Sequence, residues 1–357
     1  MSVPQAIFID TSVFDEQCYN FQSAAMTAFL DATKMVPLIL LLPDPTEREI
    51  NRHIQEQVEA AAKVLSDAKR KAPILSKWTG WPAKFDARDI RWQLQSFAQG
   101  EWRVFLERFD VRRLGYEDVD LPRIMNWYEF KRAPFGVGKK EKEFPDAIAV
   151  DAIAFYATKN QTEVAVVSKD PDFKSACAHY SALLHFSSLP ALTEAMLSAD
   201  KRIASLKALL KSDVNPIAKG IEEAFAECAF YPEEDPQGDV EDVSVHEVDV
   251  LDLNVVSLGD GECKIAFEAR VAYSASVTYD DPDSVVGDSE DGYFALRRLS
   301  GSVSESTEMS GVAKLMLDAG GEKVCGVARL EFDDDDVCVT EIPPVEHDDD
   351  DWPEDER

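Results

Sequence analysis

The sequence has no long hydrophobic run. The longest, VPLILLLP at residues 36–43, falls far short of the roughly 20 apolar residues that a transmembrane helix needs. The N-terminal segment MSVPQAIFID also lacks the basic region and apolar core of a secretory signal peptide. We therefore expect neither a membrane span nor a signal peptide, and a cytoplasmic location.

Cysteine and histidine are scarce as well, with six and five residues in a chain of 357. No CxxC pair occurs, so the usual pattern of a zinc site is absent, and scattered thiols fit a reducing compartment. No Ser or Cys nucleophile motif surrounds a histidine, and no GxxxxGK loop is present to hold a nucleotide phosphate. These absences disfavour zinc proteins, nucleophilic hydrolases and P-loop enzymes.

Positive charge is scarce in only one part of the chain. Residues 1–215 hold 28 Lys and Arg against 29 Asp and Glu, a net charge of −1. Residues 216–357 hold 9 against 39, so −30 of the total of −31 lies there. A split this sharp, in a chain longer than one ordinary core, predicts two domains with different roles.

Strand and helix signals alternate in the first part. Strands are expected at residues 6–9, 38–42, 163–168 and 183–186. Helices are expected at residues 23–34, 46–71, 86–109, 145–158, 171–179 and 189–210. Strands separated by helices in this order predict an α/β fold, with a parallel sheet covered on both faces.

The second part has short runs of alternating β-branched residues separated by Gly and Asp turns. Strands are expected at residues 243–256, 263–279, 293–304, 312–317 and 323–332, after a helix at 216–230. This pattern predicts a small acidic antiparallel β domain. The expected domains are residues 1–212, a helical linker at 213–238, the β domain at 239–343 and an acidic disordered tail at 344–357.

Acidic residues stand where the elements of the first part begin or end. Asp10 follows the first strand in IFIDTSVF, and Asp170 follows the third in VVSKDPDF. Asp146 opens a helix in FPDAIAVDAI, and either Glu47 or Glu49 lies near the start of the helix after the second strand. Ligands of an open parallel sheet lie outside the carboxyl ends of its strands, so these carboxylates are expected at one edge.

Gathered carboxylates repel one another unless a cation lies among them. Oxygen ligands without paired His or Cys favour Mg²⁺ or Mn²⁺, which activate water and stabilise charge on a phosphoryl oxygen. Each residue alone also suits a structural role, since Asp146 favours a helix N-terminus and Asp170 before Pro171 is a typical N-cap. Their joint placement favours a metal centre.

The order of these motifs resembles that of the PIN-domain nucleases, over residues 1–190. The resemblance implies a three-layer α/β/α fold and Mg²⁺- or Mn²⁺-dependent hydrolysis of RNA. Because residues 73–144 are longer than compact members need, extra helices are expected beside the cleft. Carried over residue by residue, the implied metal ligands and catalytic residues are Asp10, Glu49, Asp146 and Asp170, with Asp172 as a fifth candidate ligand and Thr11 or Ser12 as a hydroxyl behind them.

A nuclease must also hold a polyanion beside its own carboxylates. The expected nucleic-acid contacts are the cations that precede Asp146 or adjoin Asp170, namely Lys131, Arg132, Lys139, Lys140, Lys142 and Lys169. Trp127, Tyr128 and Phe135 lie among them and are candidates to stack on bases, with ordinary core packing as the alternative.

The leading interpretation is a metal-dependent endoribonuclease acting on single-stranded RNA. The alternative is a catalytically silent PIN scaffold that binds RNA or a protein. The acidic second part repels nucleic acid, so partner binding is its first expected role and autoinhibition of the nuclease its second. The sequence leaves open DNA as a substrate, a homodimer, and a role in toxicity, phage defence or RNA processing.

Overall fold

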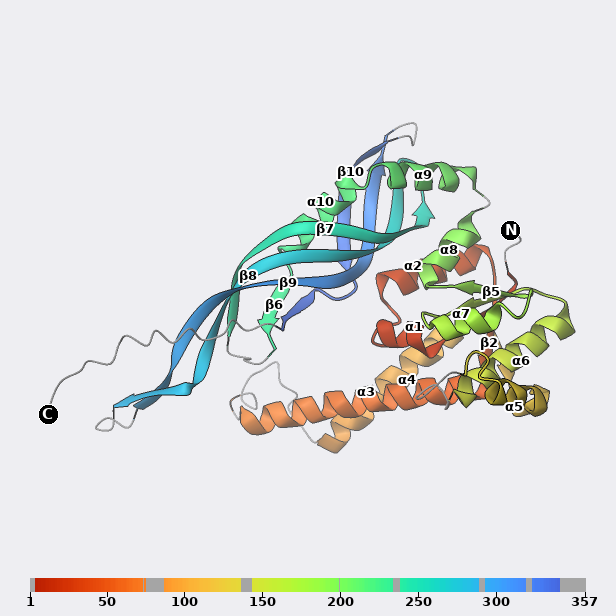
Figure 1. Ribbon diagram of the computed structural model, residues 1–357, viewed down its shortest axis with the longest axis horizontal. Coiled ribbons are helices and arrows are strands. Elements are labelled where there is room, and N and C mark those ends of the chain that lie inside the picture. The colour runs from red at the N-terminus through yellow and green to blue at the C-terminus, as the bar shows by residue number, and fades with distance from the viewer. Residues whose placement is uncertain are drawn as a thin grey trace. The chain divides into compact units, whose positions relative to one another are not determined.

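The chain forms two compact units, residues Met1–Asp200 and Lys201–Arg357. The computed structural model describes residues 4–72, 74, 87–135, 143–198, 200–233, 238–288, 293–318 and 323–340 (Figure 1). The division falls before the boundary expected at residue 212, because the helix Lys201–Ser212 groups with the second unit. The tail expected at residues 344–357 lies outside the described residues.

The first unit is built on a parallel sheet of five strands in the order β3-β2-β1-β4-β5. The strands are β1 (Ala6–Ile9), β2 (Ile39–Pro43), β3 (Asp110–Leu114), β4 (Val164–Val167) and β5 (Leu183–Phe186). The central strands β1 and β4 are buried along their whole length, as a sheet covered on both faces requires.

Helices connect these strands. They are α1 (Thr11–Glu16), α2 (Ala24–Met35), α3 (Asp44–Lys71), α4 (Ala87–Leu106), the 3₁₀ helix η2 (Tyr116–Asp118), α5 (Leu121–Glu129), α6 (Phe144–Asn160), α7 (Pro171–Cys177) and α8 (Leu189–Leu197). Proline stands in the first turn of α3, α5, α6, α7 and α8, where its missing N–H costs no hydrogen bond. The long helix α3 packs against α4 (Figure 1).

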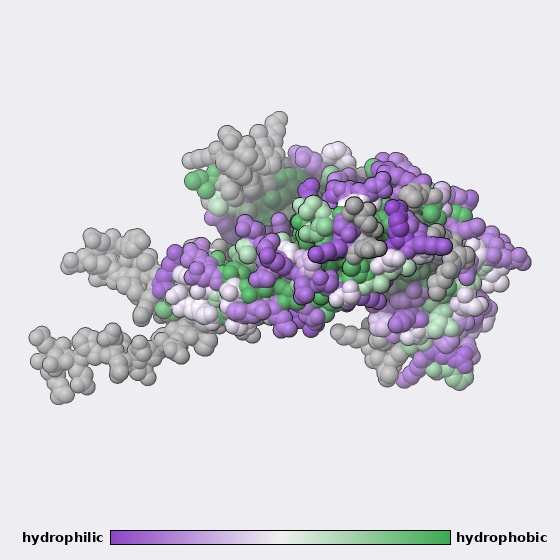
Figure 2. All heavy atoms as spheres, turned by 90° about the horizontal axis from the view of Figure 1, so that it is seen from above, coloured by the Kyte–Doolittle hydropathy of each residue, from purple (hydrophilic) through white to green (hydrophobic). Residues whose placement is uncertain are grey.

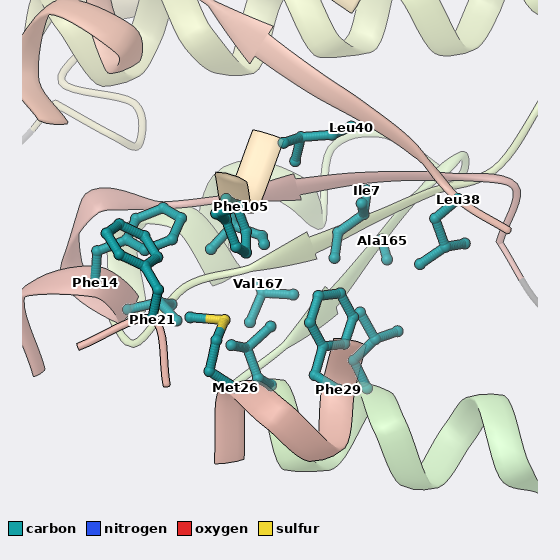
Figure 3. Close-up of a cluster of buried hydrophobic side chains, with 14 of the residues drawn as sticks. Ile7, Phe14, Phe21, Met26, Phe29, Leu38, Leu40, Phe105, Ala165 and Val167 are labelled. Carbon is teal, nitrogen blue, oxygen red and sulfur yellow. The ribbon is translucent and has the colours of Figure 1, made fainter. Parts of the chain in front are cut away.

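Two apolar clusters lie on opposite faces of the sheet. Alternate strand residues such as Ile7, Leu40 and Val167 face an aromatic cluster from α1, α2 and α4 (Figure 3). The rings of Phe14 and Trp102 meet edge to face, with centroids 5.6 Å apart. The intervening strand residues face α6 and α7 instead. This arrangement confirms the predicted three-layer α/β/α fold.

Some elements differ from the predicted ones. β3 was not expected, because its sequence DVRRL is polar and the strand lies at an edge of the sheet, with most side chains exposed. The helix α1 was also not expected, whereas α5 lies within residues 73–144, where extra helices were expected. The single helix expected at residues 189–210 is two helices, α8 and α9, and α8 ends at Leu197 with Ser198 as its C-cap.

The second unit is centred on a four-stranded antiparallel sheet in the order β10-β9-β8-β7. Its elements are α9 (Lys201–Ser212), α10 (Asn215–Phe225), β6 (Ala229–Pro232), β7 (Asp239–Leu258), β8 (Glu262–Asp288), β9 (Tyr293–Leu317), β10 (Val324–Phe332) and β11 (Asp336–Val339). β6 and β11 form a separate parallel pair. The predicted antiparallel β domain is confirmed, although the two strands expected at 293–304 and 312–317 are one continuous strand, β9.

The core of this unit lies between the sheet and α10. Every second residue of β8 from Cys263 to Tyr279 is buried, the alternation expected of a sheet with one covered face. Phe225 of α10 packs on Tyr273, with ring centroids 5.2 Å apart. The turn between β7 and β8 occurs at the expected position, where Gly261 has a φ of +76° that favours glycine.

Among the described helices, none combines the length and the apolar character needed to cross a bilayer. On the face shown in Figure 2, hydrophilic side chains cover most of the described surface, with apolar ones scattered among them.

Candidate functional site

Asp10 lies at the carboxyl end of β1, beside β4. Its backbone N–H donates to the carbonyl of Val167 (2.9 Å), which extends the pairing of the two strands by one residue. Its side chain is only 6 % exposed. The hydroxyls of Ser12 and Ser168 both donate to Oδ2 of Asp10, at 2.5 and 2.8 Å. These contacts fix one carboxylate at the centre of the sheet edge.

Asp170 is joined to the same position through Ser168. The backbone N–H of Asp170 donates to the hydroxyl of Ser168 (3.0 Å), which in turn donates to Asp10. Oδ1 of Asp170 accepts from the backbone N–H of Asp172 (2.7 Å) and so caps α7. Asp170 therefore has the structural role weighed from the sequence. Its charge also raises the pKa of Asp10, which brings it within the electrostatic reach of the site.

Glu47 and Glu49 face different partners, although they lie two residues apart at the start of α3. Arg113 of β3 binds Glu47 with three N–H···O contacts of 2.9 to 3.2 Å. Glu49 instead accepts from the hydroxyl of Thr11 (3.4 Å), the residue next to Asp10. Of the two alternatives that the sequence left open, Glu49 is the one directed toward Asp10.

Burial and mutual repulsion perturb the carboxylates at this edge. Burial is the main cause that raises the pKa of Asp146 to about 8, with smaller contributions from the charge of Asp10, from Glu143 through a hydrogen bond and its charge, and from the charge of Glu49. Burial also raises the pKa of Asp10, against the lowering effect of its two serine donors. The charge of Asp10 acts on Asp146 in the first turn of α6, and the charge of Asp170 acts on Asp10, so these carboxylates form one acidic centre.

The pKa of Glu49 is raised in the same way. Burial is the main cause, and the charge of Asp10 adds to it, while His53 and Arg52 oppose it. Strongly perturbed carboxylates that influence one another are typical of functional sites, although structural ion pairs can produce them too.

Asp151 is a carboxylate with a structural role. It lies five residues beyond Asp146 on α6 and is fully buried. It accepts from Nε of Arg123 (2.6 Å) and from the backbone N–H of Asp120 (2.8 Å). This carboxylate joins α5 to α6 and has all its charge engaged, so it takes no part in the acidic centre.

The acidic centre offers carboxylate and hydroxyl oxygens, which are the donor atoms that hard divalent cations prefer. Among the residues that the structure describes, however, no three His, Cys, Asp or Glu side chains are grouped closely enough to hold a metal ion. The carboxylates influence one another across the site without being drawn together, as like charges dictate.

The cations expected to contact nucleic acid are placed in different ways. Lys169 adjoins Asp170 but forms an ion pair with Glu16 of α1. Lys131 and Arg132 follow α5, and the guanidinium of Arg132 lies 5.7 Å from the ring centroid of Phe130. The remaining three, Lys139, Lys140 and Lys142, lie outside the described residues.

The aromatic residues interleaved with these cations differ in burial, from the buried Phe135 to the exposed Tyr128. Phe135 is buried and packs on Tyr128 and Phe144, with centroids 5.5 and 4.9 Å away. Trp127 packs on Tyr180 (6.3 Å). Phe135 therefore has the core-packing role that was the alternative to base stacking, because it has no exposed face for a base.

Residues that the sequence did not single out also surround the centre. Ser168 links Asp10 to Asp170, and His53 lies one helical turn after Glu49, with Nε2 4.0 Å from Oε1 of that carboxylate. Asp15 of α1 holds the other ring nitrogen of His53 at 2.8 Å. The four-residue spacing of Glu49 and His53 on a helix was a usable signal for their proximity.

Comparison with known proteins bears on the first unit. Residues 7–173 match a protein-family model described as a PIN domain. No curated protein and no solved structure matches the chain. The matched range runs from β1 into α7 and includes Asp10, Glu49, Asp146 and Asp170. Residues 7–173 therefore match the PIN-domain family, which agrees with the resemblance seen in the order of the sequence motifs.

Proposed function

We propose that the first unit is a divalent-metal-dependent endoribonuclease that hydrolyses phosphodiester bonds of single-stranded RNA. PIN domains are generally nucleases. The observation that carries the proposal is the acidic centre, in which Asp10 after β1, Glu49 of α3 and Asp146 of α6 have raised pKa values, and the charge of Asp10 acts on the other two. Maintaining such a cluster costs free energy, which a bound cation would offset.

The candidate ligands are Asp10, Glu49, Asp146 and Asp170. A Mg²⁺ or Mn²⁺ ion held there would supply an activated water and stabilise negative charge on a phosphoryl oxygen. Thr11 and Ser12 are candidates to keep the carboxylates oriented, since Thr11 donates to Glu49 and Ser12 to Asp10. Asp172 follows Asp170 in the first turn of α7 and remains a fifth candidate.

Cleavage of single-stranded RNA in Mn²⁺ tests this proposal, with DNA of the same sequence as the comparison substrate. We expect cleavage by the wild type and its loss in the double variant Asp10→Asn, Asp146→Asn. Asp67→Asn is a matched control, because Asp67 lies near the far end of α3, where its described ion pair is with Arg70. Activity that survives in the double variant would refute the proposed centre.

A silent scaffold that binds RNA or a protein is the second candidate. The observation that favours it is the spacing of the carboxylates, since among the described residues no three are close enough to hold an ion. Calorimetric titration with Mn²⁺ discriminates the two. Binding that disappears in Asp10→Asn supports the enzyme, whereas no heat of binding together with no cleavage of RNA or DNA supports the scaffold.

For the second unit we propose a role in binding a protein partner, with autoinhibition as the alternative. Residues 216–357 hold 39 Asp and Glu against 9 Lys and Arg, so this part repels nucleic acid and attracts basic surfaces. Cleavage rates of the full chain and of a chain ending at Asp200 can be compared at low salt. Faster cleavage by the shorter chain would support autoinhibition, and equal rates would refute it.

A further inference from the structure

Arg52 lies on α3 at the margin of the acidic centre. Its Nη2 donates to Nε2 of His53 (3.1 Å) and to Oε1 of Glu49 (3.4 Å). Its Nε lies 3.9 Å from Oε1 of Glu56, one turn further along the helix. The side chain is 61 % exposed, so the guanidinium sits beside a carboxylate of the site and remains open to solvent.

His53 is held firmly behind this guanidinium. Its Nδ1 lies 2.8 Å from Oδ1 of Asp15, and the ring of Tyr19 meets it edge to face with centroids 6.4 Å apart. Only 21 % of the His53 side chain is exposed. Because an ionised carboxylate can only accept, Nδ1 of His53 donates to Asp15, and Nε2 faces Arg52.

The backbone that carries these partners is strained. Cys18 and Tyr19, directly after α1, have φ values of +45° and +58°, which non-glycine residues rarely adopt. This conformation places the Tyr19 ring on Phe14 and Phe21 on one side and on His53 on the other. Strained segments of this kind persist where the surrounding structure holds them and are concentrated at functional sites.

Arg52 contacts Glu49, a carboxylate of the acidic centre, whereas three other described cations nearby pair with carboxylates outside it. Arg113 directs its Nε and Nη2 at Glu47, and Arg123 binds the fully buried Asp151. Lys169 is paired with Glu16. An arginine has five N–H donors in a planar fork, and the described contacts of Arg52 use Nη2 and Nε, leaving the two N–H bonds of Nη1.

We propose that Arg52, oriented by the Asp15–His53 pair beside Glu49, binds a phosphate of the nucleic-acid strand next to the acidic centre. The proposal rests on the nuclease function proposed above. A polyanion approaches a group of carboxylates only if a cation offsets the repulsion. A guanidinium suits this role because its planar fork matches two phosphate oxygens and its charge persists at all working pH values. Asp15 and His53 are positioning residues, because they act through Arg52.

A purely structural role for Arg52 predicts only a small contribution to stability from a pair within its own helix. An exposed pair between residues three apart on a helix contributes only about 0.3–0.5 kcal/mol and needs no partner from another helix. Arg70 provides that case on the same helix, since it is exposed and pairs with Asp67 three residues before it at 3.0 Å. Arg70→Gln is therefore a matched control for Arg52→Gln.

Binding of fluorescent single-stranded RNA to the full chain, measured in EDTA at several salt concentrations, tests the proposal without any need for cleavage. We expect Arg52→Gln to weaken binding about tenfold, as loss of a charge-assisted hydrogen bond predicts. The slope of log K against log salt should fall by about 0.7, which corresponds to one phosphate contact on a single strand. Arg70→Gln should change neither quantity, and Arg52→Lys should restore the slope but only part of the affinity.

The positioning role is tested by a double-mutant cycle. Asp15→Asn or His53→Asn should weaken RNA binding in the presence of Arg52 and have no further effect in Arg52→Gln. A thermal melt of each variant separates these effects from a loss of folding. Equal binding by Arg52→Gln and Arg70→Gln, with folding intact, would overturn the proposal, as would a wild type that binds no RNA.

Cleavage is measured separately in Mn²⁺ on the same proteins. A wild type that binds RNA with the expected dependence on Arg52 but cleaves nothing refutes the proposed hydrolysis and leaves the phosphate contact standing. If the wild type cleaves RNA and Arg52→Gln has the same KM, the phosphate contact is refuted and the proposed hydrolysis stands.

Discussion

The hydroxyl of Ser168 donates to Oδ2 of Asp10 at 2.8 Å, although 158 residues separate the two in the sequence. The contact joins the ends of β4 and β1, where the sheet presents its acidic edge. Together with Ser12, Ser168 opposes the effect of burial and lowers the pKa of Asp10. The relationship makes Ser168 the first residue to test for control over the acidic centre.

We predict that Ser168→Ala destabilises the first unit by about 1–3 kcal/mol, because it removes a donor from a buried carboxylate. It should also raise the pKa of Asp10, so activity that needs the ionised carboxylate is lost at a higher pH than in the wild type. Urea unfolding and a pH–rate profile measure the two effects. Ser175→Ala is the control, since this exposed serine donates to the carbonyl of Pro171 in its own helix. An identical acid limb in both variants would contradict the prediction.

The raised pKa of Asp146 predicts how stability depends on pH. The folded chain holds the Asp146 proton up to a pH of about 8, whereas the unfolded chain releases it near the ordinary value of 3.8. The stabilisation from this proton is therefore complete below 3.8 and is lost as the pH rises toward 8. Thermal melts in EDTA should show the melting temperature of the wild type falling over this range. The stability of Asp146→Asn relative to the wild type should therefore increase as the pH rises.

Addition of a divalent cation should reverse that trend, because a cation favours the ionised carboxylate. We expect Mn²⁺ to raise the melting temperature of the wild type more at pH 8 than at pH 5. If Mn²⁺ raises the melting temperature equally at both pH values, or still raises it in Asp146→Asn, then Asp146 is not part of the proposed metal centre.

The pair Glu47 and Glu49 offers a comparison within a single helical turn. We predict that Glu49→Gln weakens Mn²⁺ binding at least tenfold, since removal of even the partners that orient metal ligands costs roughly 10- to 100-fold. Glu47→Gln should leave Mn²⁺ binding unchanged and cost about 1 kcal/mol or less, because its pair with Arg113 lies at the surface. Calorimetric titration measures both, and equal losses would contradict the assignment.

The same pair shows what a sequence can and cannot predict. The order of strands and helices, and hence the edge at which Asp10 and Asp170 lie, followed from local hydrophobic patterns. The choice between Glu47 and Glu49 did not, because it depends on Arg113, which lies 66 residues away in a polar edge strand. The strand itself carries little hydrophobic signal, since its side chains face solvent.

The surroundings of Arg52 were hidden for a similar reason. Asp15 and His53 are 38 residues apart, and their contact exists only because α1 packs against α3. The capping role of Asp170 and its effect on the pKa of Asp10 coexist in the structure, whereas the sequence presented them as alternatives. Local patterns thus located the strand ends, and long-range packing decided which side chains meet there.

The second unit can be perturbed by itself through Phe225. This residue is fully buried and lies against Tyr273 of β8 and Phe230 of β6, with centroids 5.2 and 5.3 Å away. Phe225→Ala should cost about 3–5 kcal/mol, the usual range for removal of a buried ring. The loss should appear as a lower melting temperature for the second unit alone, because the first unit has its own core on both faces of the parallel sheet.

The effect of Phe225→Ala on RNA cleavage then distinguishes the two roles of the acidic unit. If that unit binds a protein partner, cleavage by the first unit stays at the wild-type rate while the partner is lost. If it restrains the nuclease, partial unfolding releases the restraint and the rate rises, most strongly at low salt where charge repulsion is least screened. Leu251→Ala is a suitable control, because Leu251 is an exposed apolar residue of β7 whose loss leaves the core intact. A fall in the cleavage rate that parallels a fall in the stability of the first unit would contradict the independence of the two cores.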